Sequence, residues 1–140
     1  MKFGGTSVEG ATAFQTAARI VAERQAQRPV VVVSAMAGFT DALLGCVNET
    51  VDSGETASIA TLEKHFDRHV RVIETLLTNE APRLLELVHK SRNEIQAQLN
   101  FLATDASQKK SVADAVASNG ERLSAELFAA VLKSLIPRAP

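Results

Sequence analysis

The chain has 140 residues, a length typical of one domain with its own core, and a formal net charge of −1 at pH 7. This near-neutral charge excludes a surface that attracts nucleic acid or anionic membranes, and the absence of Trp and Tyr excludes an aromatic platform for stacked bases. The single cysteine, Cys46, excludes an internal disulfide, and no apolar run reaches the roughly 20 residues of a membrane span, so we expect a cytoplasmic protein with a buried, unreactive thiol.

The first predicted element is a helix that begins at Ser7 and continues to about Gln25. The segment before it, KFGGTS, holds more than a helix start requires, because one capping side chain is enough for that. Glycines allow a ligand to approach the backbone, and a lysine neutralises a phosphoryl group in transfer. Residues 2–7, the glycine-rich segment, are therefore either a phosphate-binding segment or an ordinary turn with Ser7 as the N-cap.

Residues 30–33 form a continuous run of valines, which is typical of a strand buried on both faces in a parallel sheet. One strand cannot form a sheet, so residues 1–3 add a second strand, a partner chain does, or the chain is a piece of something larger. The 34–40 segment follows the carboxyl end of the valine run, where open α/β sheets bind ligands. It is either a binding loop or a plain connection to a helix that Asp41 caps and that runs to about Val51.

Apolar residues then recur at three- and four-residue steps over residues 59–77 and again over residues 84–102. Two helices joined by a short turn, with Pro82 in an early helical position, predict an αα-hairpin. His65 and His69 lie four residues apart on the first of these helices. No third ligand or HExxH glutamate accompanies them, so a surface or helix-packing role is favoured over a metal site.

A third helical region begins near Lys109, pauses at residues 118–120 and ends before Pro137. Glu121 would open the second part of this region. Its carboxylate either complements the helix dipole or holds an ammonium group. Arg122 is expected to be a solvated surface residue or the partner of a carboxylate.

Three segments in this order, KFGGTSV, VVVVSAMAGFTDALL and SNGERLSAELFAAVL, resemble the start of the aspartate kinases. Other amino-acid kinases share the glycine-rich start without the rest of the set, and the resemblance covers essentially all 140 residues. It implies an α/β fold, the N-terminal part of the amino-acid kinase (carbamate kinase-like) fold. That part would be mostly helical, with few parallel strands and the αα-hairpin as an insertion.

The resemblance also implies transfer of the γ-phosphoryl group of ATP, with Mg²⁺, to the β-carboxylate of L-aspartate, the entry to lysine, threonine and methionine biosynthesis. Lys2 would be the catalytic residue that neutralises the transferring group. No protein ligand for a metal is implied. The phosphate-binding residues would be Gly4, Gly5, Thr6 and Ser7, and the substrate-binding residues would be Ser34, Gly38, Thr40 and Glu121.

The kinase domain of this family is more than twice as long as this chain, and ACT regulatory domains usually follow it. Residues 1–140 would supply its substrate side, without most of the adenine-nucleotide site and without an ACT domain. We therefore expect the isolated chain not to turn over, and to form a homo-oligomer or to join a complementing chain. The alternatives are a non-catalytic helical module for oligomerisation or complementation that keeps an anion-binding loop, and a binder of another small anion.

Overall fold

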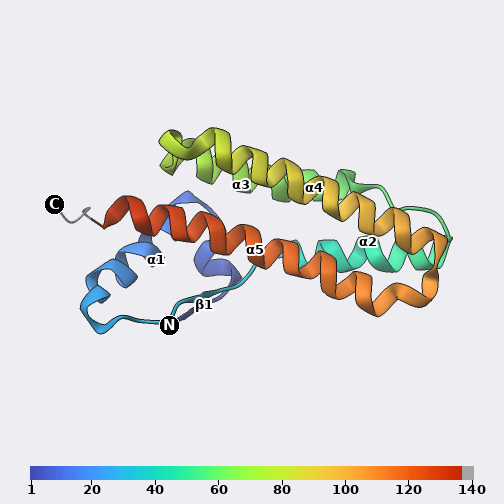
Figure 1. Ribbon diagram of the computed structural model, residues 1–140, viewed down its shortest axis with the longest axis horizontal. Helices are drawn as coiled ribbons and strands as arrows, with labels where there is room; N and C mark the ends of the chain where they lie inside the picture. Colours follow the sequence, from blue (N-terminus) through green and yellow to red (C-terminus); the bar gives the residue numbers. More distant parts are fainter. Residues whose placement is uncertain (137–140) are drawn as a thin grey trace.

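The computed structural model describes residues 1–136, which form five α-helices and one parallel pair of strands (Figure 1). The helices are α1 (Ala11–Glu23), α2 (Phe39–Ser53), α3 (Glu63–Leu76), α4 (Ala81–Thr104) and α5 (Lys109–Leu135). The strands are β1 (Lys2–Phe3) and β2 (Val32–Val33). Five 3₁₀ turns join these elements: η1 (Gly5–Val8), η2 (Gln25–Gln27), η3 (Ile59–Leu62), η4 (Thr78–Glu80) and η5 (Ala106–Gln108). Pro137, expected to end the last helix, lies outside the described residues.

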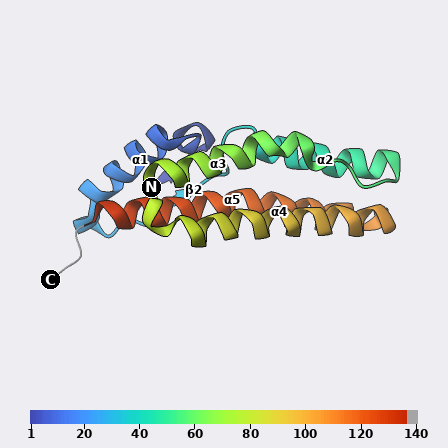
Figure 2. The ribbon, with the colours of Figure 1, turned by 90° about the horizontal axis from the view of Figure 1, so that it is seen from above.

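The helices lie in two layers, with α4 and α5 side by side and α1, α2 and α3 packed against them (Figure 2). The αα-hairpin is confirmed as α3 and α4, and Pro82 lies in the first turn of α4. Helix α5 contacts each of the other four helices as well as β2. Near its end, Phe128 packs on Phe3 of β1 and on Phe14 of α1, with ring centroids 5.6 and 6.3 Å apart. The two layers and the sheet therefore share one core.

The sheet confirms that residues 1–3 supply the second strand, because Lys2 lies opposite Val32 and Phe3 opposite Val33. The expected burial of the valine run on both faces is wrong. Val30 is 81% exposed and Val32 54% exposed, whereas Val31 and Val33 are half-buried against the core. Side chains alternate across a strand, and within residues 1–136 helices cover only one of the two faces.

Both predicted helix caps are wrong. Ser7 lies inside η1, and Gly10, in extended conformation, occupies the N-cap position of α1. At α2 the N-cap is Gly38, whose φ of +78° is in the left-handed region that favours glycine. Asp41 is already in the first helical turn, where its carboxylate complements the positive end of the helix dipole instead of capping an amide.

The predicted pause at residues 118–120 is also wrong, because α5 runs through it without interruption. Gly120 is instead a site of close packing. A Cβ atom there would lie 3.0 Å from the Cβ of Ala35 and 3.2 Å from a ring carbon of Phe39. Glycine is therefore present because α5 passes so close to the chain that follows β2, and not because the helix ends.

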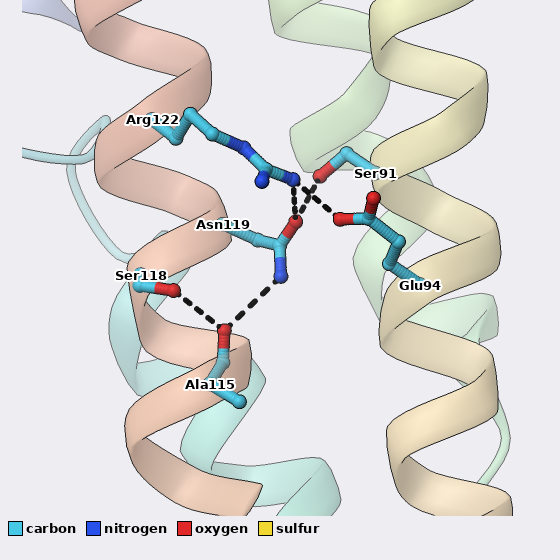
Figure 3. Close-up of polar contacts among 6 residues, drawn as sticks. All are labelled: Ser91, Glu94, Ala115, Ser118, Asn119 and Arg122. Carbon is cyan, nitrogen blue, oxygen red and sulfur yellow. Dashed lines mark hydrogen bonds and ion pairs between the residues drawn. The ribbon is translucent and has the colours of Figure 1, made fainter.

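Asn119 is tolerated in mid-helix because both the oxygen and the nitrogen of its side-chain amide are hydrogen-bonded (Figure 3). Its Oδ1 accepts hydrogen bonds from Ser91 Oγ of α4, at 2.9 Å, and from Arg122, at 2.8 Å. Its Nδ2 donates to the Ala115 carbonyl one turn earlier. Asn119, which the sequence predicts to be part of a helix break, thus joins α5 to α4 through hydrogen bonds.

His65 and His69 are buried, which selects the packing role from the two expected alternatives, a surface position or packing within the helix hairpin. Both rings pack on Phe39, with centroids 5.2 and 5.3 Å away. His69 is fully buried, its Nδ1 donates to the His65 carbonyl at 2.7 Å, and no atom of residues 1–136 forms a hydrogen bond with its Nε2. Among residues 1–136, no group of three or more His, Cys, Asp or Glu side chains gathers that could hold a metal.

Cys46 is buried as expected, and burial raises the pKa of its thiol, which keeps it protonated at neutral pH. No helix within residues 1–136 has the length and apolarity needed to cross a bilayer.

The close packing at Gly120 predicts that Gly120→Ala lowers the free energy of unfolding. Overpacking against fixed atoms costs about 1–3 kcal/mol, more than the roughly 1 kcal/mol that alanine adds as a better helix former. Gly45 is the matched control, because it is exposed within α2 and no atom lies within 4 Å of its Cβ position. Gly45→Ala should therefore raise the free energy of unfolding in urea denaturation. Stabilisation of similar size by both substitutions would contradict the proposed contact.

The burial of His69 predicts a loss of stability in mild acid. Burial lowers the pKa of His69 from 6.5 to about 4, so the folded state holds the ring neutral while the unfolded state takes up a proton. Stability is then complete above pH 6.5 and falls by roughly 3 kcal/mol as the pH drops toward 4. Urea denaturation over this range should show the loss in the parent chain and in His89→Gln, which alters an exposed histidine. His69→Gln should flatten the dependence, and an unchanged slope in that variant would refute the assignment.

Candidate functional site

The glycine-rich segment and the 34–40 segment meet at one edge of the sheet. Each follows the carboxyl end of a strand, and because β1 and β2 are parallel the two ends lie together. Backbone hydrogen bonds join them directly: Ser34 N donates to Phe3 O at 3.0 Å, and Ala37 N donates to Gly5 O at 3.2 Å. Two of the three motifs found in the sequence are thus parts of one surface.

The two adjacent glycines serve different purposes. A Cβ atom on Gly5 would lie 2.9 Å from Ala35 O and 3.0 Å from Ala37 N, both backbone atoms that cannot rotate away. A Cβ atom on Gly4 would meet nothing within 4 Å. Contact with the 34–40 segment therefore requires glycine at position 5, whereas Gly4 is exposed to whatever approaches the site.

The remaining predicted phosphate-side residues face solvent. Lys2 on β1 and Thr6 and Ser7 in η1 are exposed. On the other segment, Ser34 and Thr40 are half-buried, and Gly38 is exposed at the start of α2. The two joined segments thus carry a lysine ammonium and several hydroxyl groups, which are donors suited to an anion.

The third motif reaches this region through Gly120, which packs on Ala35 and Phe39. Arg122 is confirmed as the partner of a carboxylate, because it forms an ion pair with Glu94 and a hydrogen bond with Asn119 (Figure 3). Glu121 is exposed, and its carboxylate makes no hydrogen bond or ion pair with another residue of the 1–136 part. In this motif the asparagine, glycine and arginine pack α5, and the glutamate carboxylate is left to solvent.

Sequence reasoning missed two residues of α3 that contact the 34–40 segment. Arg68 Nη2 donates to Ala37 O at 2.7 Å and to His65 Nδ1 at 2.6 Å. The His65 ring is stacked on Phe39 at an interplanar angle of 19°. Burial, together with the positive charges of Arg68 and Lys64, lowers the pKa of His65 and keeps the ring neutral. On an amphipathic helix, no periodicity shows which distant carbonyl an arginine will reach.

An open groove of about 520 Å³ lies between α3 and this loop. The residues that line it are Ala37, Gly38, Lys64, His65, Asp67, Arg68 and Arg71. A larger hollow of about 660 Å³ lies where η4 meets the end of α5, and none of the three motifs lines it. The basic groove therefore borders the 34–40 segment, and a smaller hollow of about 250 Å³ is lined by Phe3 and Ser7 of the glycine-rich segment together with residues of α1.

Comparison with known proteins places this site in a family. Residues 1–136 match the model of the amino acid kinase family. The chain is 33% identical over 138 residues to the chloroplastic bifunctional aspartokinase/homoserine dehydrogenase 1 of Zea mays, an alignment that covers 97% of this chain and 15% of that protein. It is 31% identical to the chloroplastic aspartokinase 2 of Arabidopsis thaliana, over 96% of this chain and 24% of that protein.

Among solved structures, E. coli aspartokinase III in complex with aspartate and ADP matches with a TM-score of 0.62 and 26% identity. The match covers 94% of this chain and 28% of that chain. The chain thus spans less than a third of the length of each of these proteins. The expected fold, mostly helical with few parallel strands and an αα-hairpin, is confirmed by the match and by the observed elements. The chain belongs to the amino acid kinase family, and the members that it resembles are aspartokinases.

Proposed function

We propose that this chain forms the aspartate-binding side of an aspartokinase-type phosphotransferase, whose reaction converts ATP and L-aspartate into ADP and 4-phospho-L-aspartate. One observation carries the proposal: the glycine-rich segment and the 34–40 segment are hydrogen-bonded to each other at the carboxyl edge of the sheet. The similar aspartokinase III has been solved with aspartate and ADP, which is the pair of ligands that such a site would serve.

The chemistry needs little from the protein beyond position and charge. A carboxylate oxygen of aspartate forms a bond to the γ-phosphorus, and the bond from that phosphorus to the ADP oxygen breaks. No base is required, because the nucleophile is already ionised. Lys2 would neutralise the charge of the phosphoryl group in transit, and Glu121 would pair with the α-ammonium group of aspartate.

The residues fit the anionic part of the two ligands. Thr6 and Ser7 offer exposed hydroxyl groups next to Gly4, and Ser34 and Thr40 offer two more across the contact. ATP would supply the phosphoryl group, and bound Mg²⁺ would offset the charge of its phosphates. The described residues gather no carboxylate cluster for a metal, so we assign no protein ligand to Mg²⁺.

The proposal extends to a place in the synthesis of lysine and related amino acids from aspartate. The plant relatives are chloroplastic proteins, whereas for this chain a cytoplasmic location stays a prediction. A homo-oligomer also stays a prediction.

A second candidate function is that of a complementation module, and the open face of β2 favours it. Val32 on β2 and Val30, two residues before it, are both exposed. Parallel strands are normally covered on both faces. A separate polypeptide with the rest of an aspartokinase catalytic domain would cover this face and complete the sheet.

Binding of aspartate by the purified chain is the first test. Aspartate should shift the backbone amide signals of Ser34, Thr40 and Glu121 in ¹⁵N-labelled protein. Gly5→Ala should weaken the effect by about tenfold or more, since its Cβ displaces the backbone of the 34–40 segment, whereas Gly45→Ala, at an exposed position within α2, should change it by less than about twofold. The absence of any shift at millimolar aspartate in the parent chain would sink the proposed function.

Complementation is tested by adding the remainder of an aspartokinase catalytic domain as a second polypeptide. We expect no aspartate-dependent ADP release from the isolated chain and measurable release from the mixture, reduced about 100-fold or more by Lys2→Ala because phosphoryl transfer then lacks its cation. Val32→Asp should prevent association, since it places a charge on the covered face. Phe101→Asp is the control, because Phe101 is 50% exposed but lies on α4. If the mixture with Val32→Asp releases as much ADP as the mixture with the parent chain, the open face of β2 is excluded as the binding surface.

A further inference from the structure

Ala37 is held from two sides. Its amide donates to Gly5 O at 3.2 Å, and its carbonyl accepts from Arg68 Nη2 at 2.7 Å. The first bond joins the 34–40 segment to the glycine-rich segment, and the second joins it to α3, 31 residues further along the chain. One residue, Ala37, therefore connects three parts of the molecule.

Arg68 is itself oriented by His65. Arginine has donors only, so His65 Nδ1 must be the acceptor in the 2.6 Å contact and the ring proton must lie on Nε2. The same ring stacks on Phe39, the first residue of α2, and its Cε1 is 3.6 Å from the Cβ position of Gly38. His65, which orients Arg68, thus packs on the residues that directly follow Ala37, whose carbonyl Arg68 binds.

We propose that Arg68 is a positioning residue, which holds Ala37 against Gly5 and thereby sets the distance between the phosphate side and the aspartate side of the site. The purpose of this positioning rests on the proposed function, whereas the clamp itself does not. In phosphoryl transfer, misplacement of the two reactants by even about 1 Å is costly, so a fixed spacing between these segments has chemical value.

The neighbouring cations of the groove do not share this role. Lys64 and Arg71 line the same groove, but in residues 1–136 neither donates a hydrogen bond to the 34–40 segment. Lysine at position 68 would also be a poor substitute, because its single ammonium lacks the planar geometry with which one guanidinium nitrogen serves a carbonyl and a ring nitrogen together. Arg71 is consequently the matched control for Arg68.

The clamp is tested without any ligand, by exchange of the Ala37 amide hydrogen in D₂O. In Arg68→Met this amide should exchange about tenfold faster, since loss of the carbonyl anchor lets the segment open, while amides in the middle of α4 keep their rates. Arg71→Met should leave the Ala37 rate within about twofold of the parent. Arg68→Lys should fall between the two. An unchanged Ala37 rate in a folded Arg68→Met protein would overturn the proposal.

If Arg68→Met fails to fold, His65→Phe takes its place, because phenylalanine keeps the stack on Phe39 and removes the acceptor that orients Arg68. An Ala37 rate in His65→Phe equal to that of the parent chain would then refute the clamp.

Aspartate binding separates the two proposals. When the parent chain binds aspartate, Arg68→Met should weaken binding by about tenfold, and Arg83→Met, which alters an exposed arginine at the start of α4, by less than about twofold. Equal affinity in parent and Arg68→Met would refute positioning for the site. When the parent binds no aspartate, the proposed function fails, and the exchange of Ala37 alone decides whether Arg68 holds the segment.

Discussion

The close approach of α5 to the chain that follows β2 is the constraint on which the rest of the structure depends. Gly120 makes this approach possible, because any side chain there would meet Ala35 and Phe39 within 3.2 Å. Because α5 can pass so close, one uninterrupted helix packs against α1, α2, α3 and α4 at once. The same contact brings the motif that contains Glu121 to the sheet edge where the other two motifs meet.

The αα-hairpin is more than an appendage to this arrangement. Its first helix, α3, buries His65 and His69 against Phe39 and reaches the 34–40 segment with Arg68. Its second helix, α4, is fastened to α5 by Ser91 and Glu94 through Asn119 and Arg122 (Figure 3). The hairpin is thus tied by polar contacts to both of the elements that border the candidate site, and it restrains them in addition to covering the core.

The two faces of the short sheet have different physical characters. One face packs on the helices, with Phe3 against Phe128, while the other leaves Val30 and Val32 exposed. The exposed valines leave the packing of the core unaffected, but they form an apolar surface that favours association with another polypeptide. The chain spans 28% of aspartokinase III, so most of that protein's chain has no counterpart here.

What the sequence alone determined was local. The three motifs and their order identified the family, the three- and four-residue apolar steps predicted the hairpin, and the lone cysteine was rightly expected to be buried. Tertiary structure decided the rest. Burial of the valine run depended on which face of the sheet the helices cover. The need for glycine at position 120 depended on Ala35, a neighbour 85 positions away in the sequence. The role of Arg68 depended on a carbonyl 31 positions away. Residue patterns encode preferences over a few turns of chain, whereas contacts across such separations exist only once the layers have packed.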